Sequence, residues 1–256
     1  MSMLREFPIL EFDPDTRAFI EPGKVIRPID IAERCVICFF KEVTDKLAEQ
    51  DKLVKVAEVG SECGTIPIYE MVYHGVRIAV FNPLIGAPAA AAMLEEVIAY
   101  GCRKFIACGG AGVLQKDIAV GHLIIPVSAV RDEGTSYHYL SPAREVNANV
   151  DAVKAIERVL TRHSVRYLTA KTWTTDAFYR ETRNKVALRK SEGCVTVEME
   201  SAAFFAVSQF RGVTFGQILY GGDDLSCDEW DRREWNDRKD IRERIFHLAL
   251  ECCKEL

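Results

Sequence analysis

Short apolar segments alternate with helical patterns along most of the chain. Apolar runs of strand length occupy residues 35–40, 76–81, 104–110, 122–130, 194–200 and 214–222. Helical patterns occupy residues 41–50, 88–101, 149–163, 201–210 and 240–256. Because strands that alternate with helices build sheets covered on both faces, this order predicts a three-layer α/β/α fold with a mostly parallel, mixed central sheet.

The first 34 residues lack this alternation. They carry turn signals, Asp-Pro-Asp-Thr at 13–16 and Glu-Pro-Gly-Lys at 21–24, and are predicted to form an N-terminal arm, residues 1–34. No repeat, low-complexity segment or Pro/Gly/Ser-rich linker interrupts the remainder of the chain. Residues 35–256 are therefore expected to form a single domain, which is long enough to bury a sizeable core.

Composition and charge indicate which kinds of binding partner to expect. The net charge of −5 disfavours a nucleic-acid or membrane-surface partner, since both attract basic faces. Nine cysteines without framework spacing suit free thiols in a reducing compartment, and no apolar run of membrane-spanning length occurs, so a cytoplasmic location is expected. The Cys35/Cys38 pair lacks the second ligand pair of a zinc site, so we expect core residues there and no metal or cofactor.

Glycines gather where one apolar segment ends. Gly109, Gly110 and Gly112 would let backbone N–H groups approach a ligand, or they form a tight turn. A nucleotide-cofactor enzyme is a weaker alternative, because the spacing is not G-x-G-x-x-G and no helical pattern comes after the glycines.

Carboxylates mark two further segment ends. Glu198 and Glu200 flank Met199 where an apolar strand pattern meets a helical one; they either cap the helix or face a cavity, where they would bind a sugar diol with Met199 against the ring. Asp223 and Asp224 come after two glycines. They either belong to a Gly-Asp turn, or one of them is a general acid that gives a proton to a leaving group.

Taken in order, these segment ends resemble the nucleoside phosphorylase and nucleosidase superfamily, which holds uridine phosphorylase, hexameric purine nucleoside phosphorylase and the methylthioadenosine nucleosidases. The resemblance runs from about Cys35 to Asp224. Its most specific motif is V-E-M-E-S-A at 197–202, supported by S-A-V-R-D-E-G-T-S at 128–136 and T-D-A-F-Y at 175–179. It implies an enzyme that cleaves the N-glycosidic bond of a small-molecule nucleoside, assembled as a homo-oligomer.

The resemblance also implies roles for single residues. Glu200 would bind the ribose hydroxyls, with Met199 packed on the sugar and Glu198 supporting the site. Phe178 would stack on the base. Asp223, rather than Asp224, would hydrogen-bond or protonate N7, which favours purines over uridine.

For two further contacts with the substrate, this sequence matches the family pattern only in part. Uridine phosphorylases read uracil with a Gln and an Arg after the stacking aromatic; the Gln is missing here, and Arg183 is the candidate base reader. Gly109 and Gly110 would line the substrate site, although Gly110 stands where the family has Ser or Thr.

The anion-binding motifs of the phosphorylases are also changed. Their G-D-P-x-R loop corresponds to residues 38–47, C-F-F-K-E-V-T-D-K-L, and their second arginine to Ala107. Two phosphate contacts, each worth about 1.5–3 kcal/mol as hydrogen bonds to a charged group, are missing.

These residues leave three hypotheses about activity. The first is a nucleoside phosphorylase that uses phosphate as co-substrate. The second is a nucleoside hydrolase in which Glu42 activates water, as the Glu before V-T does in the nucleosidases, although Leu219 replaces their arginine. The third is a non-catalytic nucleoside-binding protein. The sequence does not assign Trp230 and Trp235 to a lid or to a subunit contact.

Overall fold

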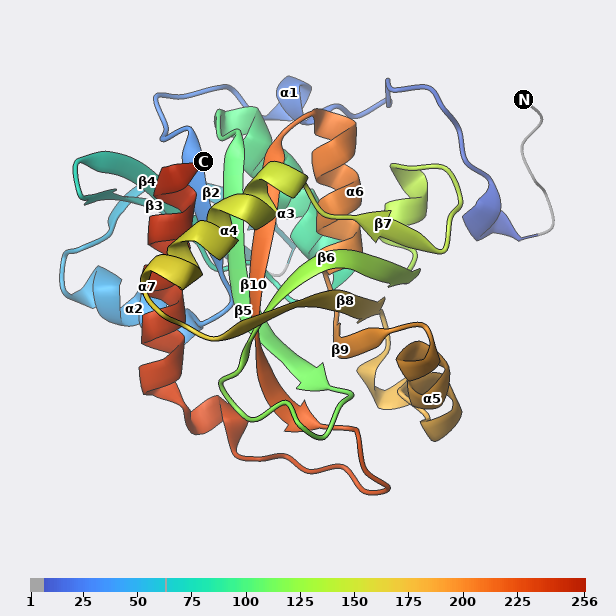
Figure 1. Ribbon diagram of the computed structural model, residues 1–256. Helices are drawn as coiled ribbons and strands as arrows, with labels where there is room; N and C mark the ends of the chain where they lie inside the picture. Colours follow the sequence, from blue (N-terminus) through green and yellow to red (C-terminus); the bar gives the residue numbers. More distant parts are fainter. Residues whose placement is uncertain (1–6, 63) are drawn as a thin grey trace.

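A computed structural model describes residues 7–62 and 64–256 of the chain (Figure 1). Its strands are β1 (Arg34–Cys38), β2 (Val54–Ser61), β3 (Gly64–Tyr73), β4 (Val76–Phe81), β5 (Lys104–Val113), β6 (Leu123–Asp132), β7 (Glu145–Asn147), β8 (Tyr167–Thr175), β9 (Cys194–Glu198) and β10 (Thr214–Asp224). Its α-helices are α1 (Pro22–Val25), α2 (Lys41–Glu49), α3 (Ala87–Tyr100), α4 (Val150–Arg162), α5 (Arg183–Ser191), α6 (Ser201–Arg211) and α7 (Lys239–Glu255). Short 3₁₀ helices are η1 (Pro8–Leu10), η2 (Thr135–His138), η3 (Phe178–Arg180) and η4 (Trp235–Asp237).

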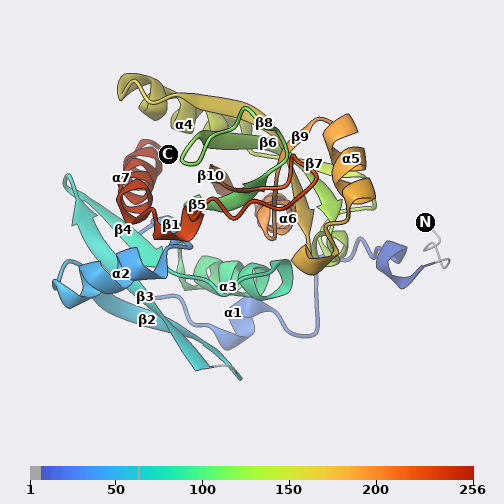
Figure 2. The same ribbon diagram turned by 90° about the horizontal axis from the view of Figure 1, so that it is seen from below.

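Helices cover both faces of the sheet (Figures 1 and 2). Cys35 and Ile37 of β1 pack in the apolar cluster of α3 and α6, whereas Val36 and Cys38 pack in the cluster of α2, α4 and α7. Successive strand residues point to opposite faces, so β1 is buried on both sides and reads as a continuous apolar run. The predicted three-layer α/β/α class is confirmed. Cys35 and Cys38 face opposite layers and cannot share one metal ion.

The sheet is partly closed on itself. Its order is β10-β6-β8-β9-β5-β1-β4-β3-β2, with β7 beside β6 and an additional pairing of β10 with β5. The pairings of β5 with both β9 and β10 therefore join β5, β9, β8, β6 and β10 into a ring. β1 and β10 both run parallel to β5, so the carboxyl ends of these three strands meet at one edge.

Several elements differ from the sequence expectation. β5 continues through all three of its clustered glycines to Val113, and β10 passes through Gly221 and Gly222 to Asp224, so neither glycine group forms a tight turn. β8 was not predicted, because its many threonines interrupt the apolar pattern expected of a buried strand. Thr172 and Thr174 are nevertheless fully buried, with their hydroxyls hydrogen-bonded to β9. Burial of polar side chains is possible there because each finds a partner.

The segment before β1 is extended and largely exposed. Residues 7–33 contain only η1 and α1, and an ion pair of 3.3 Å between Glu21 and Arg211 ties the segment to α6. Residues 1–6 of the predicted arm lie outside the described residues. Within 7–62 and 64–256, no helix has the length and apolar character that crossing a membrane requires.

Candidate active site

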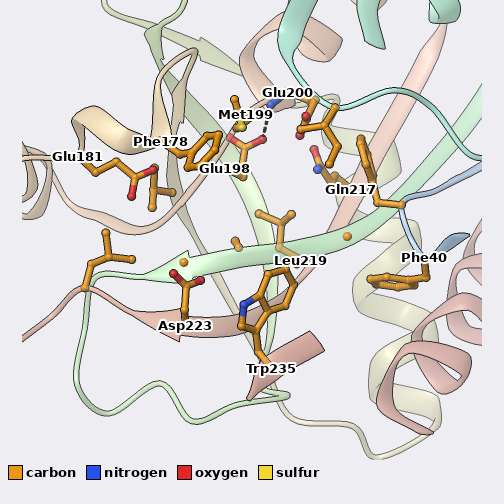
Figure 3. Close-up of a pocket in the computed structure, with 18 of the residues that line it drawn as sticks. Phe40, Phe178, Glu181, Glu198, Met199, Glu200, Gln217, Leu219, Asp223 and Trp235 are labelled. Atoms are coloured by element: carbon orange, nitrogen blue, oxygen red, sulfur yellow. Dashed lines mark hydrogen bonds between the residues drawn. The ribbon is translucent and has the colours of Figure 1, made fainter. Parts of the chain in front are cut away.

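A cavity of about 660 Å³ lies at the edge where β1, β5 and β10 end (Figure 3). Seven of the predicted site residues line it: Gly109, Gly110, Phe178, Glu198, Met199, Glu200 and Asp223. Gly112, Trp230 and Trp235, which the sequence left without a definite role, line it as well. Arg183 and Glu42 are not among its lining residues. Lining residues that the sequence did not indicate include Phe40, Glu181, Gln217 and Arg242. These residues come from four separate parts of the chain, so no local sequence motif predicts them.

Glu198 acts as the cap of α6. One carboxylate oxygen accepts the backbone N–H groups of Glu200 (2.8 Å) and Ser201 (2.6 Å), and the other accepts the Thr174 hydroxyl (2.6 Å). These contacts satisfy N–H groups that have no partner within the first turn of a helix. Burial raises the pKa of Glu198, and the three contacts oppose that rise. The carboxylate of Glu198 therefore uses its hydrogen bonds to stabilise the fold, although its side chain borders the cavity.

Glu200 stands at the N-cap position of α6 and faces the cavity. Its Oε1 accepts the backbone N–H of Gly86 at 2.6 Å; Gly86 has φ = 99°, a conformation that favours glycine. Burial, followed by repulsion from Glu198, raises the pKa of Glu200 to about 8. Of two acids only two residues apart, one caps the helix and the other is available to a ligand.

The two adjacent aspartates also separate into different environments. Asp223 lines the cavity and its Oδ2 accepts the indole N–H of Trp230 at 2.7 Å. Asp224 points away: it forms an ion pair with Arg233 and accepts the backbone N–H of Ser226 at 2.7 Å. Burial acts to raise the pKa of Asp224, but these partners hold it below its ordinary value. Asp223 is thus the aspartate placed for chemistry.

The loop between β8 and α5 contributes an aromatic ring and an acid. Phe178 is 51% exposed and its ring centroid lies 4.1 Å from that of Tyr179. Glu181 is partly buried in the lining, and burial followed by repulsion from Asp223 raises its pKa to about 7. Arg183 begins α5 and donates to the backbone oxygen of Asp228 at 2.7 Å. We call Phe178, Glu181 and Asp223 the loop end of the cavity.

The opposite part of the cavity is aromatic and carries one cation. The guanidinium of Arg242 lies 5.4 Å from the ring centroid of Phe40 and 5.3 Å from that of Trp235. It also donates to Glu42 Oε1 at 2.7 Å and to the Tyr220 hydroxyl at 3.0 Å. We call Phe40, Trp235 and Arg242 the aromatic end. Glu42 reaches this end only through its ion pair with Arg242.

Trp235 explains why two strands carry glycine here. A Cβ atom at Gly110 would lie 2.5 Å from Cζ3 of the Trp235 ring, and one at Gly222 would lie 3.0 Å from Cδ2. Real Cβ atoms do not come as close as the distance at Gly110, and the distance at Gly222 is tighter than most, so the indole packs on β5 and β10 because both positions lack side chains. The sequence drew attention to the glycines and to Trp235 separately, but it did not indicate that they are in contact.

The cavity lining is acidic. Its carboxyl groups belong to Glu181, Glu198, Glu200 and Asp223, whereas its basic side chain among the described residues is that of Arg242. Such a lining favours a ligand that is neutral when it binds and becomes positively charged as it reacts.

Comparison with known proteins agrees with this geometry. The model of a family described as "Phosphorylase superfamily" matches residues 33–252. The chain belongs to this superfamily. The resemblance inferred from the V-E-M-E-S-A and accompanying motifs is thereby confirmed, and so is the expectation of an enzyme. The family acts on small-molecule nucleosides, by phosphorolysis or by hydrolysis.

Individual relatives match this chain at modest identity. A guanosine phosphorylase of Halorubrum lacusprofundi is 26% identical over 236 residues, which cover 90% of this chain and 96% of the relative. A uridine phosphorylase structure from Vibrio fischeri ES114 has a TM-score of 0.72 at 25% identity, covering 90% of this chain and 94% of that one. An AMP nucleosidase structure from Bacteroides thetaiotaomicron, at 21% identity, has a TM-score of 0.69 over 88% of both chains and shares the fold.

Proposed function

We propose that this superfamily member is a nucleoside phosphorylase that cleaves the N-glycosidic bond of purine nucleosides with phosphate as the nucleophile. The observation that carries the proposal is that Glu200 and Asp223 face one cavity while their neighbours Glu198 and Asp224 are bound into the fold. One of these two free acids can bind the sugar of a nucleoside and the other can bind its base.

The sugar half fits beside Met199 and Glu200. Glu200, once it ionises as the pH approaches about 8, accepts hydrogen bonds from both ribose hydroxyls, and the thioether of Met199 packs on the sugar ring. Cleavage passes through a sugar with oxocarbenium character, so contacts that tighten as positive charge develops lower the barrier. The acidic lining adds to this stabilisation.

The base half fits at the loop end. The half-exposed ring of Phe178 provides a stacking face. Asp223 can hydrogen-bond or protonate N7 of a purine, so that the base leaves as a neutral molecule. Trp230 holds one oxygen of Asp223, which keeps the carboxylate oriented and leaves the other oxygen for the base.

Phosphate would enter at the aromatic end. Arg242 is the basic side chain in the described lining, and a guanidinium binds phosphate oxygens well. The relatives named as phosphorylases support phosphate as the nucleophile.

A nucleoside hydrolase is the second candidate, and two observations favour it. The Trp235 ring fills the space beside Gly110, where the phosphorylases have Ser or Thr, and the charge of Arg242 is paired with Glu42. Water needs less room than phosphate and no cationic site. The Glu42–Arg242 pair would also supply, from α7, the arginine that Leu219 replaces in the nucleosidase pattern.

The test is base release from adenosine, guanosine, inosine, uridine and methylthioadenosine, each with and without phosphate. The proposal predicts that purine is released only with phosphate, together with ribose 1-phosphate. Equal release in both conditions would instead establish the hydrolase. Binding of nucleosides without any release would refute both and leave a binding protein.

A further inference from the structure

Glu181 is an acid in the cavity that no predicted role accounts for. It comes directly after η3, and its side chain lies at the loop end beside Phe178 and Asp223 (Figure 3). Within residues 7–62 and 64–256, its carboxylate has no hydrogen bond or ion pair. Arg183, two residues further along the chain, donates to the backbone oxygen of Asp228 instead.

An unpaired carboxylate in a partly enclosed site is unfavourable for folding. Burial and the neighbouring Asp223 both disfavour its ionised form, and they raise the pKa of Glu181 to about 7. Groups held in this state without a partner gather where a protein meets its ligand. Glu181 is therefore available to a group that the ligand brings.

The position of Glu181 indicates which part of a nucleoside it meets. Figure 3 shows Phe178, Glu181 and Asp223 together at one side of the cavity, with Met199 between them and Glu200. If the sugar lies against Met199 and Glu200, the base extends toward the loop end. Glu181 then borders the base and not the sugar.

We propose that Glu181 selects the base, because its carboxylate accepts hydrogen bonds from two adjacent N–H groups such as those on the N1 and 2-amino edge of guanine. This inference rests on the proposed nucleoside cleavage and adds the substrate class. A carboxylate offers two parallel acceptors, which match two parallel donors. Hypoxanthine presents one N–H on that edge, and adenine presents there the N1 acceptor and no N–H, so only a protonated acid can hydrogen-bond to it.

The experiment compares kcat/KM for guanosine, inosine and adenosine in the wild type and in Glu181→Gln. The amide has nearly the same size but offers one acceptor and one donor. We expect the guanosine-to-adenosine ratio to fall at least tenfold, as happens when a paired polar edge is mismatched. Arg183→Gln is the matched control outside the cavity and should leave the ratio unchanged. If Arg183→Gln shifts the ratio and Glu181→Gln does not, Arg183 is the base reader and the inference is overturned.

The pH profile separates recognition from a structural role. The wild-type ratio should rise with pH through about 7 as Glu181 ionises, whereas Glu181→Gln should give a flat ratio. The other charged groups facing this cavity are Asp223 of β10, Glu198 and Glu200 at the end of β9, and Arg242 of α7. They remain in both proteins, so their titration cancels in the comparison. A wild-type ratio that is flat with pH would count against the inference.

Calorimetry with free guanine and free adenine tests the inference without turnover. Guanine should bind the wild type at least tenfold more tightly than Glu181→Gln, while adenine binding should change little. If no nucleoside is cleaved but this difference appears, the proposed function fails and the role of Glu181 stands. Equal guanine affinity in the two proteins, or no guanine binding to the wild type, refutes the role of Glu181.

Discussion

Replacing Glu200 by Gln should make the protein more stable and nearly inactive. The pKa of Glu200 is raised from 4.5 to about 8 by burial and by Glu198, so the folded state keeps a proton that the unfolded chain releases. For an acid with a raised pKa, the favourable contribution is complete below pH 4.5 and is lost as the pH rises to about 8. Gln carries no such proton, and its amide oxygen can still accept the N–H of Gly86.

The magnitude can be worked from the size of the shift. One pKa unit corresponds to about 1.4 kcal/mol, so the wild type should lose about 3 kcal/mol relative to Glu200→Gln between pH ~5.5 and ~7.5. Activity should move in the opposite direction. The ionised form of Glu200, which becomes populated as the pH approaches about 8, accepts from the ribose hydroxyls. Its loss removes a contact worth about 3 kcal/mol and lowers kcat/KM by ~10²-fold or more at that pH.

Denaturant unfolding of both proteins across this pH range, with base release measured on the same samples, tests the prediction. Glu198→Ala is the contrasting variant: it removes the cap of α6 and three hydrogen bonds, and should lower the unfolding free energy by about 2–4 kcal/mol throughout the range. Parallel stability curves for the wild type and Glu200→Gln would mean that Glu200 is ionised in the folded protein, which refutes the reasoning.

Two further pairs of substitutions test the cavity. Asp223→Asn should lower kcat/KM for purine nucleosides by ~10²–10⁴-fold with an unchanged unfolding midpoint, whereas Asp224→Asn, which weakens the pair with Arg233, should cost about 3 kcal/mol of stability and retain turnover. The reverse pattern would exchange their roles. Gly110→Ser places an atom against the Trp235 ring and should destabilise the wild type by about 1–3 kcal/mol, but much less in a Trp235→Ala background. Additive effects would show that the ring does not restrict this position.

The strand-end acids could be predicted because local sequence determines their surroundings. A strand followed directly by a helix places Glu198 and Glu200 at free N–H groups whatever the rest of the fold does. The sequence did not decide which of the two acids caps the helix, because either side chain could reach the N–H groups of the first turn. The contact of Glu200 with Gly86, the residue before α3, belongs to a distant part of the chain.

The sequence by itself determined the alternation of the main strands and helices, the superfamily, and seven of the residues that line the cavity, because hydrophobic periodicity and short motifs are local properties. Only the tertiary structure decided that Glu181 and not Arg183 enters the cavity, since a change of direction in a loop depends on the contacts at its ends. It also decided that Arg242 of α7 pairs with Glu42 of α2, and that Trp235 lies on Gly110. These contacts join segments that the ring of strands brings together, and no local pattern specifies them.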